Sequence, residues 1–281
     1  MKLAGAKEML CRARRGGYAI GAFEIWSSES IHAILSASVE CGVPVIVQAS
    51  PVEYRHFGGA DLMRAAVEAA AAKLGAQAAL HLDHGSSYED VVECVEAGFT
   101  SVMLDASKRP FEENAAESAR AAEYARAHGV DFEAEIGHVG QTADGTEEDM
   151  LLTSPDEAAR FMQIVRADFL AVAVGTVHGV YRREPNLQLD RLAEIAARVP
   201  EPLVLHGGSG TPQDRLAGAI KLGVAKINIC TDLVRAYLGG IAEANETLTP
   251  SIPGKFFVPG HDAIKAKATQ YIKFFAAPDK R

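Results

Sequence analysis

Short apolar, β-branched runs recur along the chain and alternate with more polar segments. The runs are YAIGAFE (18–24), VPVIVQAS (43–50), QAALHLDH (77–84), SVMLDA (101–106), VDFEAEIG (130–137), DFLAVAVG (168–175), PLVLHGG (202–208) and KINICT (226–231). Such runs are typical of strands buried on both faces of a parallel sheet. Between them lie alanine-rich segments with apolar residues at three- and four-residue spacing, a helical pattern. The chain is therefore predicted to contain eight strand-helix units.

Eight such units fit either a closed parallel barrel or an open doubly wound sheet. The positions of the polar residues favour the barrel, because they stand at or just beyond the ends of the predicted strands. They are Ser50, Asp83, His84, Asp105, Glu135, His178, His206 and Asn228. In a barrel these ends meet at one mouth, where barrel enzymes place their active sites. We predict a (β/α)8 TIM barrel of the α/β class, a single domain over residues 1–281 with an extra helix at about 261–275.

Composition narrows the possible partners. The chain has 281 residues, 48% of them hydrophobic and 23% charged, which is ordinary for a globular enzyme with one large core. A formal charge of −9 argues against binding to nucleic acid or to an anionic membrane. No stretch is long and apolar enough for a membrane span or an export signal, and the four cysteines lack metal-finger spacing. We expect a cytoplasmic protein with reduced thiols.

Three histidines follow three different predicted strands: His84, His178 and His206. Three neutral imidazoles that leave a position open form the ligand set of a catalytic Zn²⁺ site. Separate histidines that pack or hydrogen-bond near the mouth would give the same sequence pattern. From the residues alone, both interpretations stay open.

The segment HGGSGTP (206–212) also has two interpretations. The glycines could simply turn a strand into a helix with Thr211 as its N-cap and Pro212 as its first residue. Alternatively, bare backbone amides at this turn could bind phosphate, because barrels often bind phosphate in the loops after strands 7 and 8. Asn228 and Thr231 follow the eighth strand, which favours the phosphate site.

Four motifs in this order, HLDHGSS, VGTVHGVY, LVLHGGSGTP and KINICTDL, resemble the signatures of the class II, zinc-dependent ketose-bisphosphate aldolases. The resemblance to this fructose- and tagatose-bisphosphate aldolase family covers essentially the whole chain. It implies reversible cleavage of a ketose 1,6-bisphosphate or ketose 1-phosphate into dihydroxyacetone phosphate and an aldehyde. It also implies a homo-oligomer, either a dimer or a tetramer, and a sugar phosphate as the small-molecule partner.

The resemblance assigns roles to individual residues. His84, His178 and His206 match the zinc ligands, and Asp105 and Glu135 match positions for an alternative or second cation, divalent or monovalent. Asp83 matches the catalytic aspartate that exchanges a proton with the oxygen of the ketose C4 hydroxyl. The residues expected to bind substrate are Ser50, Gly179, Gly207, Gly208, Ser209, Asn228 and Thr231.

Residues 138–153 form a long polar connection beside the expected mouth and are a lid candidate. The resemblance implies that a glutamate of this loop removes the proton from dihydroxyacetone phosphate. The matching residue is Glu148, with Glu147 as the neighbouring alternative.

One position departs from the family pattern: Glu24 stands where the family usually has asparagine. A carboxylate there would repel a distal phosphate, unless it pairs with a nearby Arg or Lys and has no effect. Two rival functions remain, a metal-dependent hydrolase on the same barrel and a catalytically silent sugar-phosphate-binding homologue.

Overall fold

The computed structural model describes residues 3–140, 150–181, 184–247 and 252–277. Eight parallel strands close into a barrel in which each strand pairs with the next along the chain and β8 pairs with β1. The strands are β1 (Ile20–Glu24), β2 (Val45–Ala49), β3 (Ala78–Gly85), β4 (Ser101–Leu104), β5 (Asp131–Ile136), β6 (Phe169–Val172), β7 (Leu203–Leu205) and β8 (Val224–Ile229). The predicted (β/α)8 barrel is confirmed, and each strand overlaps one of the eight apolar runs.

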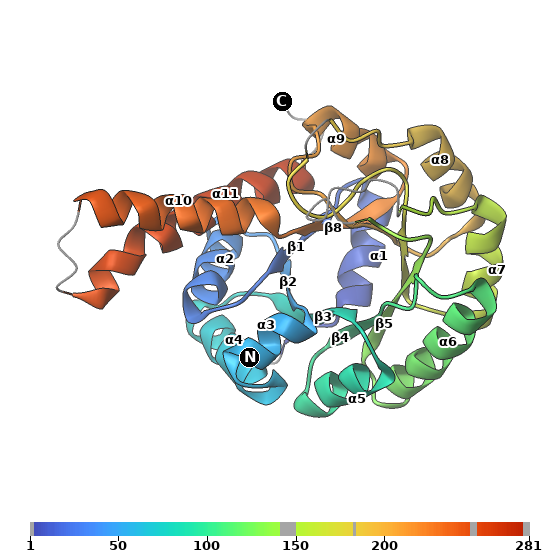
Figure 1. Ribbon diagram of the computed structural model, residues 1–281, viewed down its shortest axis with the longest axis horizontal. Helices are drawn as coiled ribbons and strands as arrows, with labels where there is room; N and C mark the ends of the chain where they lie inside the picture. The colour runs from blue at the N-terminus through green and yellow to red at the C-terminus, as the bar shows by residue number, and fades with distance from the viewer. Residues whose placement is uncertain (1–2, 141–149, 182–183, 248–251, 278–281) are drawn as a thin grey trace.

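Helices surround the barrel (Figure 1). They are α1 (Ala6–Gly16), α2 (Ser28–Cys41), α3 (Pro51–Phe57), α4 (Ala60–Leu74), α5 (Tyr88–Ala97), α6 (Phe111–Ala127), α7 (Pro155–Val165), α8 (Leu189–Arg198), α9 (Gln213–Lys221), α10 (Thr231–Thr247) and α11 (Pro253–Ala276). The tail helix α11 begins earlier than the predicted 261. Pro259 lies inside it, and proline usually ends a helix because it lacks an amide donor.

The buried apolar residues form two clusters that divide the molecule into layers. The larger cluster lies between the strands and the surrounding helices. The smaller one fills the lower half of the barrel, where residues of α1 such as Met9 and Leu10 meet inward-facing strand residues such as Ile46 and Phe169. Helix α1 therefore closes the end of the barrel opposite the mouth, and the interior above this apolar plug is free to carry polar side chains.

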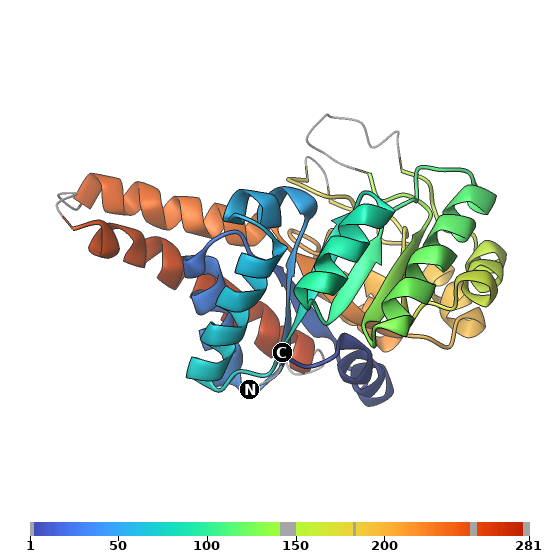
Figure 2. The ribbon, with the colours of Figure 1, turned by 90° about the horizontal axis from the view of Figure 1, so that it is seen from below.

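Helices α10 and α11 pack against each other and project from the barrel as an arm (Figures 1 and 2). Their contact depends on two glycines. A side chain at Gly240 would lie 2.4 Å from the carbonyl oxygen of Pro259, and one at Gly260 would lie 2.7 Å from the ring of Tyr237. The backbones of the two helices therefore approach closely.

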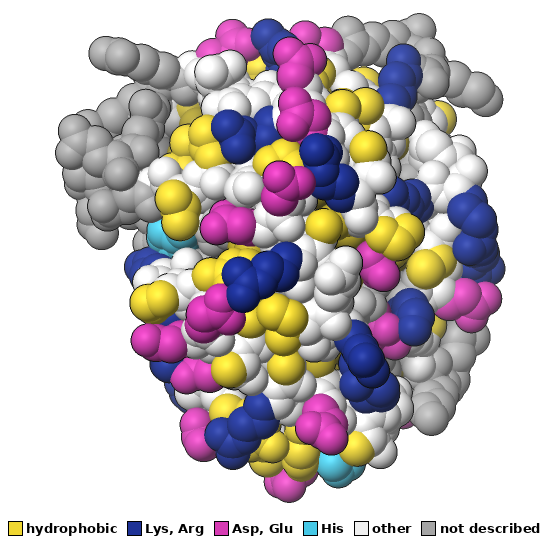
Figure 3. Space-filling model, turned by 90° about the vertical axis from the view of Figure 1, so that its right-hand side faces the viewer, with side chains coloured by type: hydrophobic (Ala, Val, Ile, Leu, Met, Phe, Trp, Pro, Cys, Tyr) yellow, Lys and Arg dark blue, Asp and Glu magenta, His cyan; other side chains and the backbone are white. Residues whose placement is uncertain are grey.

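The surface seen from the right-hand side of Figure 1 carries interspersed acidic and basic side chains (Figure 3). On this face the charges do not gather into a basic patch. Among the described residues, no helix combines the length and the apolar character needed to cross a membrane.

Candidate metal and substrate site

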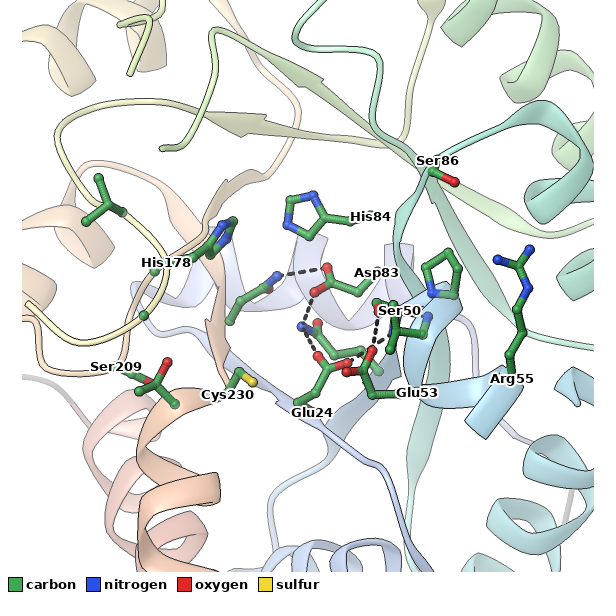
Figure 4. A pocket seen from close by; sticks show the side chains of 18 residues that line it. Glu24, Ser50, Glu53, Arg55, Asp83, His84, Ser86, His178, Ser209 and Cys230 are labelled. Atoms are coloured by element: carbon green, nitrogen blue, oxygen red, sulfur yellow. Dashed lines mark hydrogen bonds between the residues drawn. The ribbon is translucent and has the colours of Figure 1, made fainter. Parts of the chain in front are cut away.

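A cavity of about 520 Å³ opens at the mouth of the barrel, among the carboxyl ends of the strands (Figure 4). Most of the residues predicted as the site line it: Ser50, Asp83, His84, His178, Gly179, Gly207, Ser209, Asn228 and Thr231. Gly208 lies directly behind this wall and donates its amide to the Asn228 carbonyl at 3.1 Å. The structure thus brings predicted residues from the ends of five strands, β2, β3, β6, β7 and β8, to one cavity.

An irregularity of β3 presents His84 to the cavity. The register between β3 and β4 shifts between Leu82 and Gly85, and His84 has a φ of 47°, in the left-handed region. A side chain at Gly85 would lie 2.5 Å from the Met103 carbonyl oxygen, so glycine is required for this close approach. Strained backbone of this kind is concentrated at functional sites.

The three histidines meet around one point. Their ligand nitrogens lie within 4.8 Å of one another, and the ring of His84 is nearly perpendicular to those of His178 and His206. The Nε2 atom of His84 and the Nδ1 atom of His206 are 2.8 Å apart. The opposite nitrogens of these rings face carboxylates, Asp105 at 2.8 Å from His84 and Glu133 at 2.8 Å from His206.

These contacts fit a cation between the rings. If His84 and His206, as neutral rings, each donate their N–H to the facing carboxylate, the two nitrogens that face each other both carry lone pairs. Lone pairs at 2.8 Å repel unless positive charge lies between them. Three imidazole nitrogens are also the donor set that Zn²⁺ prefers.

The electrostatics of the three rings favour a positive charge at His84, and a proton there would make its contact with His206 an N–H···N hydrogen bond. Burial lowers the pKa of His84, but Asp83, Asp105 and Glu135 outweigh it and raise that pKa to about 10. Burial, together with the charge of His84, lowers the pKa values of His178 and His206 well below the ordinary value, which keeps both rings neutral. The site therefore stabilises one positive charge beside two neutral imidazoles.

Asp105 and Glu135 form a second possible metal group together with His84. Burial, reinforced by the charge of Asp105, raises the pKa of Glu135 to about 8. Burial also opposes ionisation of Asp105, but hydrogen bonds from His84 and Ser107 lower its pKa. The Oε2 atom of Glu135 is buried and has no hydrogen-bond partner among the described residues, so it could accept a cation.

Two amides hold the carboxylate of Asp83. The Nε2 atom of Gln48 donates to Oδ2 at 2.8 Å, and the Nδ2 atom of Asn228 donates to Oδ1 at 3.0 Å. The dashed lines in Figure 4 show this arrangement beside His84. The two hydrogen bonds fix the orientation of Asp83. The residue is 7% exposed and lines the cavity, so its carboxylate can still be reached from there.

A buried ionic layer supports the histidines from below. Glu133 accepts hydrogen bonds from Lys226 and His206, each at 2.8 Å, and its Oε2 atom lies 3.4 Å from His81. The side chains of all four residues are fully buried. The sequence interpretation assigned no role to Glu133 or Lys226. The alternation within their strands could have revealed both as inward-facing charges.

The HGGSG turn packs tightly. Gly207 has a φ of 70°, and a side chain there would lie 2.4 Å from the Val177 carbonyl oxygen. The Tyr181 hydroxyl donates to the Gly207 carbonyl at 2.9 Å and accepts from the Val177 amide at 3.0 Å, which ties two histidine loops together. The predicted helix start was wrong. Pro212 is the N-cap of α9, and Thr211 instead bonds to the Gly207 carbonyl at 3.0 Å.

Glu24 lies at the end of β1 and lines the cavity, but it is only 5% exposed. Its carboxylate accepts from the Ser50 amide at 3.0 Å and from Gln48 at 3.2 Å. Burial, with the charges of Asp83 and Glu53, raises its pKa well above the ordinary value. Glu24 therefore bonds to amides among the described residues. The ion pair with an Arg or Lys, the alternative in which Glu24 would have no effect on substrate, is not what the structure shows. Glu147 and Glu148 lie outside the described residues.

The chain matches the family model described as "Fructose-bisphosphate aldolase class-II" over residues 4–280. It is 40% identical to the fructose-bisphosphate aldolase of Geobacillus stearothermophilus, with 100% of this chain and 99% of that protein covered. It is 39% identical to the probable fructose-bisphosphate aldolase of Bacillus subtilis, with both proteins covered completely.

Among solved structures, the YdjI aldolase from Escherichia coli K12 is similar to this chain, with a TM-score of 0.87 and 31% sequence identity. The similarity covers 99% of both chains. The likeness thus extends over the barrel, the site and the arm.

Proposed function

The chain belongs to the class II fructose-bisphosphate aldolase family and is therefore an aldolase, a carbon–carbon lyase. On this premise we propose that it cleaves a ketose 1-phosphate or ketose 1,6-bisphosphate into dihydroxyacetone phosphate and an aldehyde, with Zn²⁺ as its metal. The observation that carries the proposal is the convergence of three histidines on one point beside the clamped Asp83.

His84, His178 and His206 would hold the zinc ion. The chemistry supplied by a bound Zn²⁺ is Lewis-acid polarisation of the ketone oxygen, which makes a Schiff-base lysine unnecessary. Asp105 and Glu135, with their neighbour His84, would take an alternative or second cation.

Asp83 would exchange the proton of the C4 hydroxyl. In the cleavage direction its carboxylate accepts that proton as the C3–C4 bond breaks, and in the reverse direction it returns the proton to the aldehyde oxygen. The amides of Gln48 and Asn228 hold both oxygens of the Asp83 carboxylate. The oxygen that accepts the proton is therefore already in position before the reaction begins. Glu148 as the base for the donor half stays a prediction from sequence, with Glu147 as its alternative.

The phosphate of the dihydroxyacetone half would lie at the glycine-rich turn. Gly207 and Gly208 allow a close approach of the backbone, and Ser209 and Thr231 offer hydroxyl groups at the same end of the cavity. Gly179 and Asn228 also line the cavity, and Ser50 lies at the end opposite Ser209.

Removal of the metal tests the proposal. Prolonged chelation should abolish cleavage of fructose 1,6-bisphosphate and of fructose 1-phosphate, and added Zn²⁺ should restore it. Full activity of the metal-free protein would contradict the mechanism, and so would borohydride trapping of substrate on a lysine. Lys226 is the lysine to inspect, because it lies within the barrel in an ion pair with Glu133.

We also propose that the protein is a homo-oligomer, a dimer or a tetramer. The arm formed by α10 and α11 carries apolar side chains that are exposed in the single chain, among them Leu238 (58% exposed) and Val258 (50% exposed). A second copy of the chain is the partner that would cover them. The cytoplasmic location stays a prediction from sequence.

A further inference from the structure

The end of the cavity opposite the glycine-rich turn is formed by the start of α3 and the end of β1. Figure 4 shows Ser209 at one end, and Ser50, Glu53 and Arg55 at the other. His84 and Asp83 lie between the two ends. If the phosphate of dihydroxyacetone phosphate lies at the glycine-rich turn, the aldehyde half of the ketose must extend toward α3.

The end at α3 is rich in hydrogen-bond acceptors. Glu53 lines the cavity, and its carboxylate accepts a hydrogen bond from the Ser50 hydroxyl. Glu24 lines the same cavity, but burial and the charges of Asp83 and Glu53 raise its pKa, so its carboxyl group adds little negative charge to that of Glu53. Because Glu53 is only partly buried, it is the carboxylate of this end that a bound molecule can reach.

Arg55 is the one Arg or Lys among the described residues that line the cavity, and its charge is already paired. The guanidinium pairs with the buried carboxylate of Asp90 and lies 5.3 Å from the centre of the Tyr54 ring. Asp90 in turn accepts hydrogen bonds from Ser86 and Ser87 at the start of α5, which fixes the pair in place. Among the described residues that line the cavity, a phosphate at this end would meet the carboxylate of Glu53 and no Arg or Lys that lacks an acidic partner.

We propose that the α3 end of the cavity binds an uncharged, hydroxylated aldehyde, so that the preferred ketose carries one phosphate, on its dihydroxyacetone half. This inference rests on the proposed function and specifies its substrate class. Sugar hydroxyls donate hydrogen bonds to carboxylates, so Glu53 provides an acceptor for the far hydroxyls of the sugar. Glu53 would repel a doubly charged phosphate at the same place. Binding would also remove water from the phosphate, which is unfavourable for a charged group.

The test compares kcat/KM for 1-phosphates and 1,6-bisphosphates of fructose and of tagatose, which covers both configurations at C4. The zinc-loaded wild type should prefer the 1-phosphate of at least one sugar by about tenfold or more, the size of effect that one or two nearby charges produce. Glu53→Gln should narrow that preference by about tenfold, raising bisphosphate cleavage and lowering 1-phosphate cleavage. The matched control is Glu89→Gln, which removes one charge from an exposed position of α5 outside the cavity and should leave the ratio unchanged.

A wild type that prefers the bisphosphates overturns the inference, and so does a ratio that Glu53→Gln leaves unaltered. A selective loss of bisphosphate cleavage in Arg55→Gln also overturns it, because Arg55 would then bind the distal phosphate. Exchange of dihydroxyacetone phosphate protons with deuterated solvent needs only the donor half of the site. If exchange proceeds while the preference is absent, this inference fails and the proposed function stands; if the zinc-loaded protein shows no exchange, the proposed function itself fails.

Discussion

The proposed proton-exchange residue, Asp83, has its orientation fixed by two neighbouring amides. A carboxylate that exchanges a proton works best when its orientation is fixed before substrate binds, and here two amides hold it from both sides. The sequence motif HLDH predicts the role of Asp83, but its two amide partners were not predicted to hold it. Gln48 and Asn228 come from different strands, so their convergence on Asp83 depends on barrel closure, which local sequence does not encode.

The first prediction concerns Asp83→Ala. We expect kcat for ketose cleavage to fall by about 10² to 10⁴, the usual contribution of a positioned proton-transfer group. Zinc content should stay unchanged, and proton exchange of dihydroxyacetone phosphate should fall much less than cleavage, because Asp83 acts on the aldehyde half. Retention of more than about a tenth of the wild-type kcat would exclude the role.

The second prediction concerns the buried carboxyl group of Glu24. Its folded-state pKa is raised above the unfolded value, so the folded protein binds more protons and stability falls as pH rises from the unfolded pKa toward the folded one. Glu24→Gln removes this dependence. Relative to the wild type, the variant should gain thermal stability as pH rises above the ordinary glutamate pKa of 4.5, and it should show little difference below that pH.

Gln48 can accommodate the new amide at position 24, because its Oε1 atom is buried without a hydrogen-bond partner among the described residues. Melting temperatures of both proteins across this pH range provide the measurement. A difference that stays constant with pH would show that Glu24 titrates alike in the folded and unfolded chains.

At the scale of elements, each strand carries an apolar lower half and a polar upper end. The apolar runs and the polar residues after them predicted the barrel and its mouth, because both are local features of sequence. The ionic layer of Glu133, Lys226 and His206 was not predicted, since it joins β5, β8 and the end of β7 inside the barrel. The direction of the His84 side chain depends on a register shift between β3 and β4, which the local sequence pattern does not reveal.

The third prediction tests this layer with Lys226→Met. The change leaves the carboxylate of Glu133 buried without its cation, which should cost about 3–5 kcal/mol of unfolding free energy. Because Glu133 orients His206, zinc affinity should also fall by about 10- to 100-fold. Denaturant unfolding and zinc titration measure the two effects.

The double variant Glu133→Gln/Lys226→Met should recover part of the lost stability, because it removes the isolated charge. Lys265→Met is the control, since it breaks an ion pair with Glu40 on the surface and should cost at most about 1 kcal/mol. Equal losses in Lys226→Met and Lys265→Met would show that the buried pair does not stabilise the barrel.

At the scale of the whole molecule, the barrel buries its own core, whereas the arm does not. Two helices that project from a domain can cover only one face of each other, so further apolar side chains stay exposed unless another surface packs on them. On the arm these include Leu238 and Val258. The close backbone contact between Gly240 and Pro259 makes the pair one rigid unit that can present this surface.

The last prediction follows from this surface. The chain has a mass of 29.9 kDa, so a protein that pairs through the arm should have a sedimentation mass of two or four times this value. Leu238→Glu combined with Val258→Glu places two charges in the contact and should shift the protein toward the monomer, because unpaired charges are costly to bury. Analytical ultracentrifugation over a range of concentrations measures the shift, and zinc content shows whether the barrel is intact. The control is Ile164→Glu. Ile164 is an apolar residue on α7 with 42% of its surface exposed, so its substitution should leave the mass unchanged. A wild type that sediments as a monomer, or a double variant with unaltered mass, would show that the arm does not join copies of the chain.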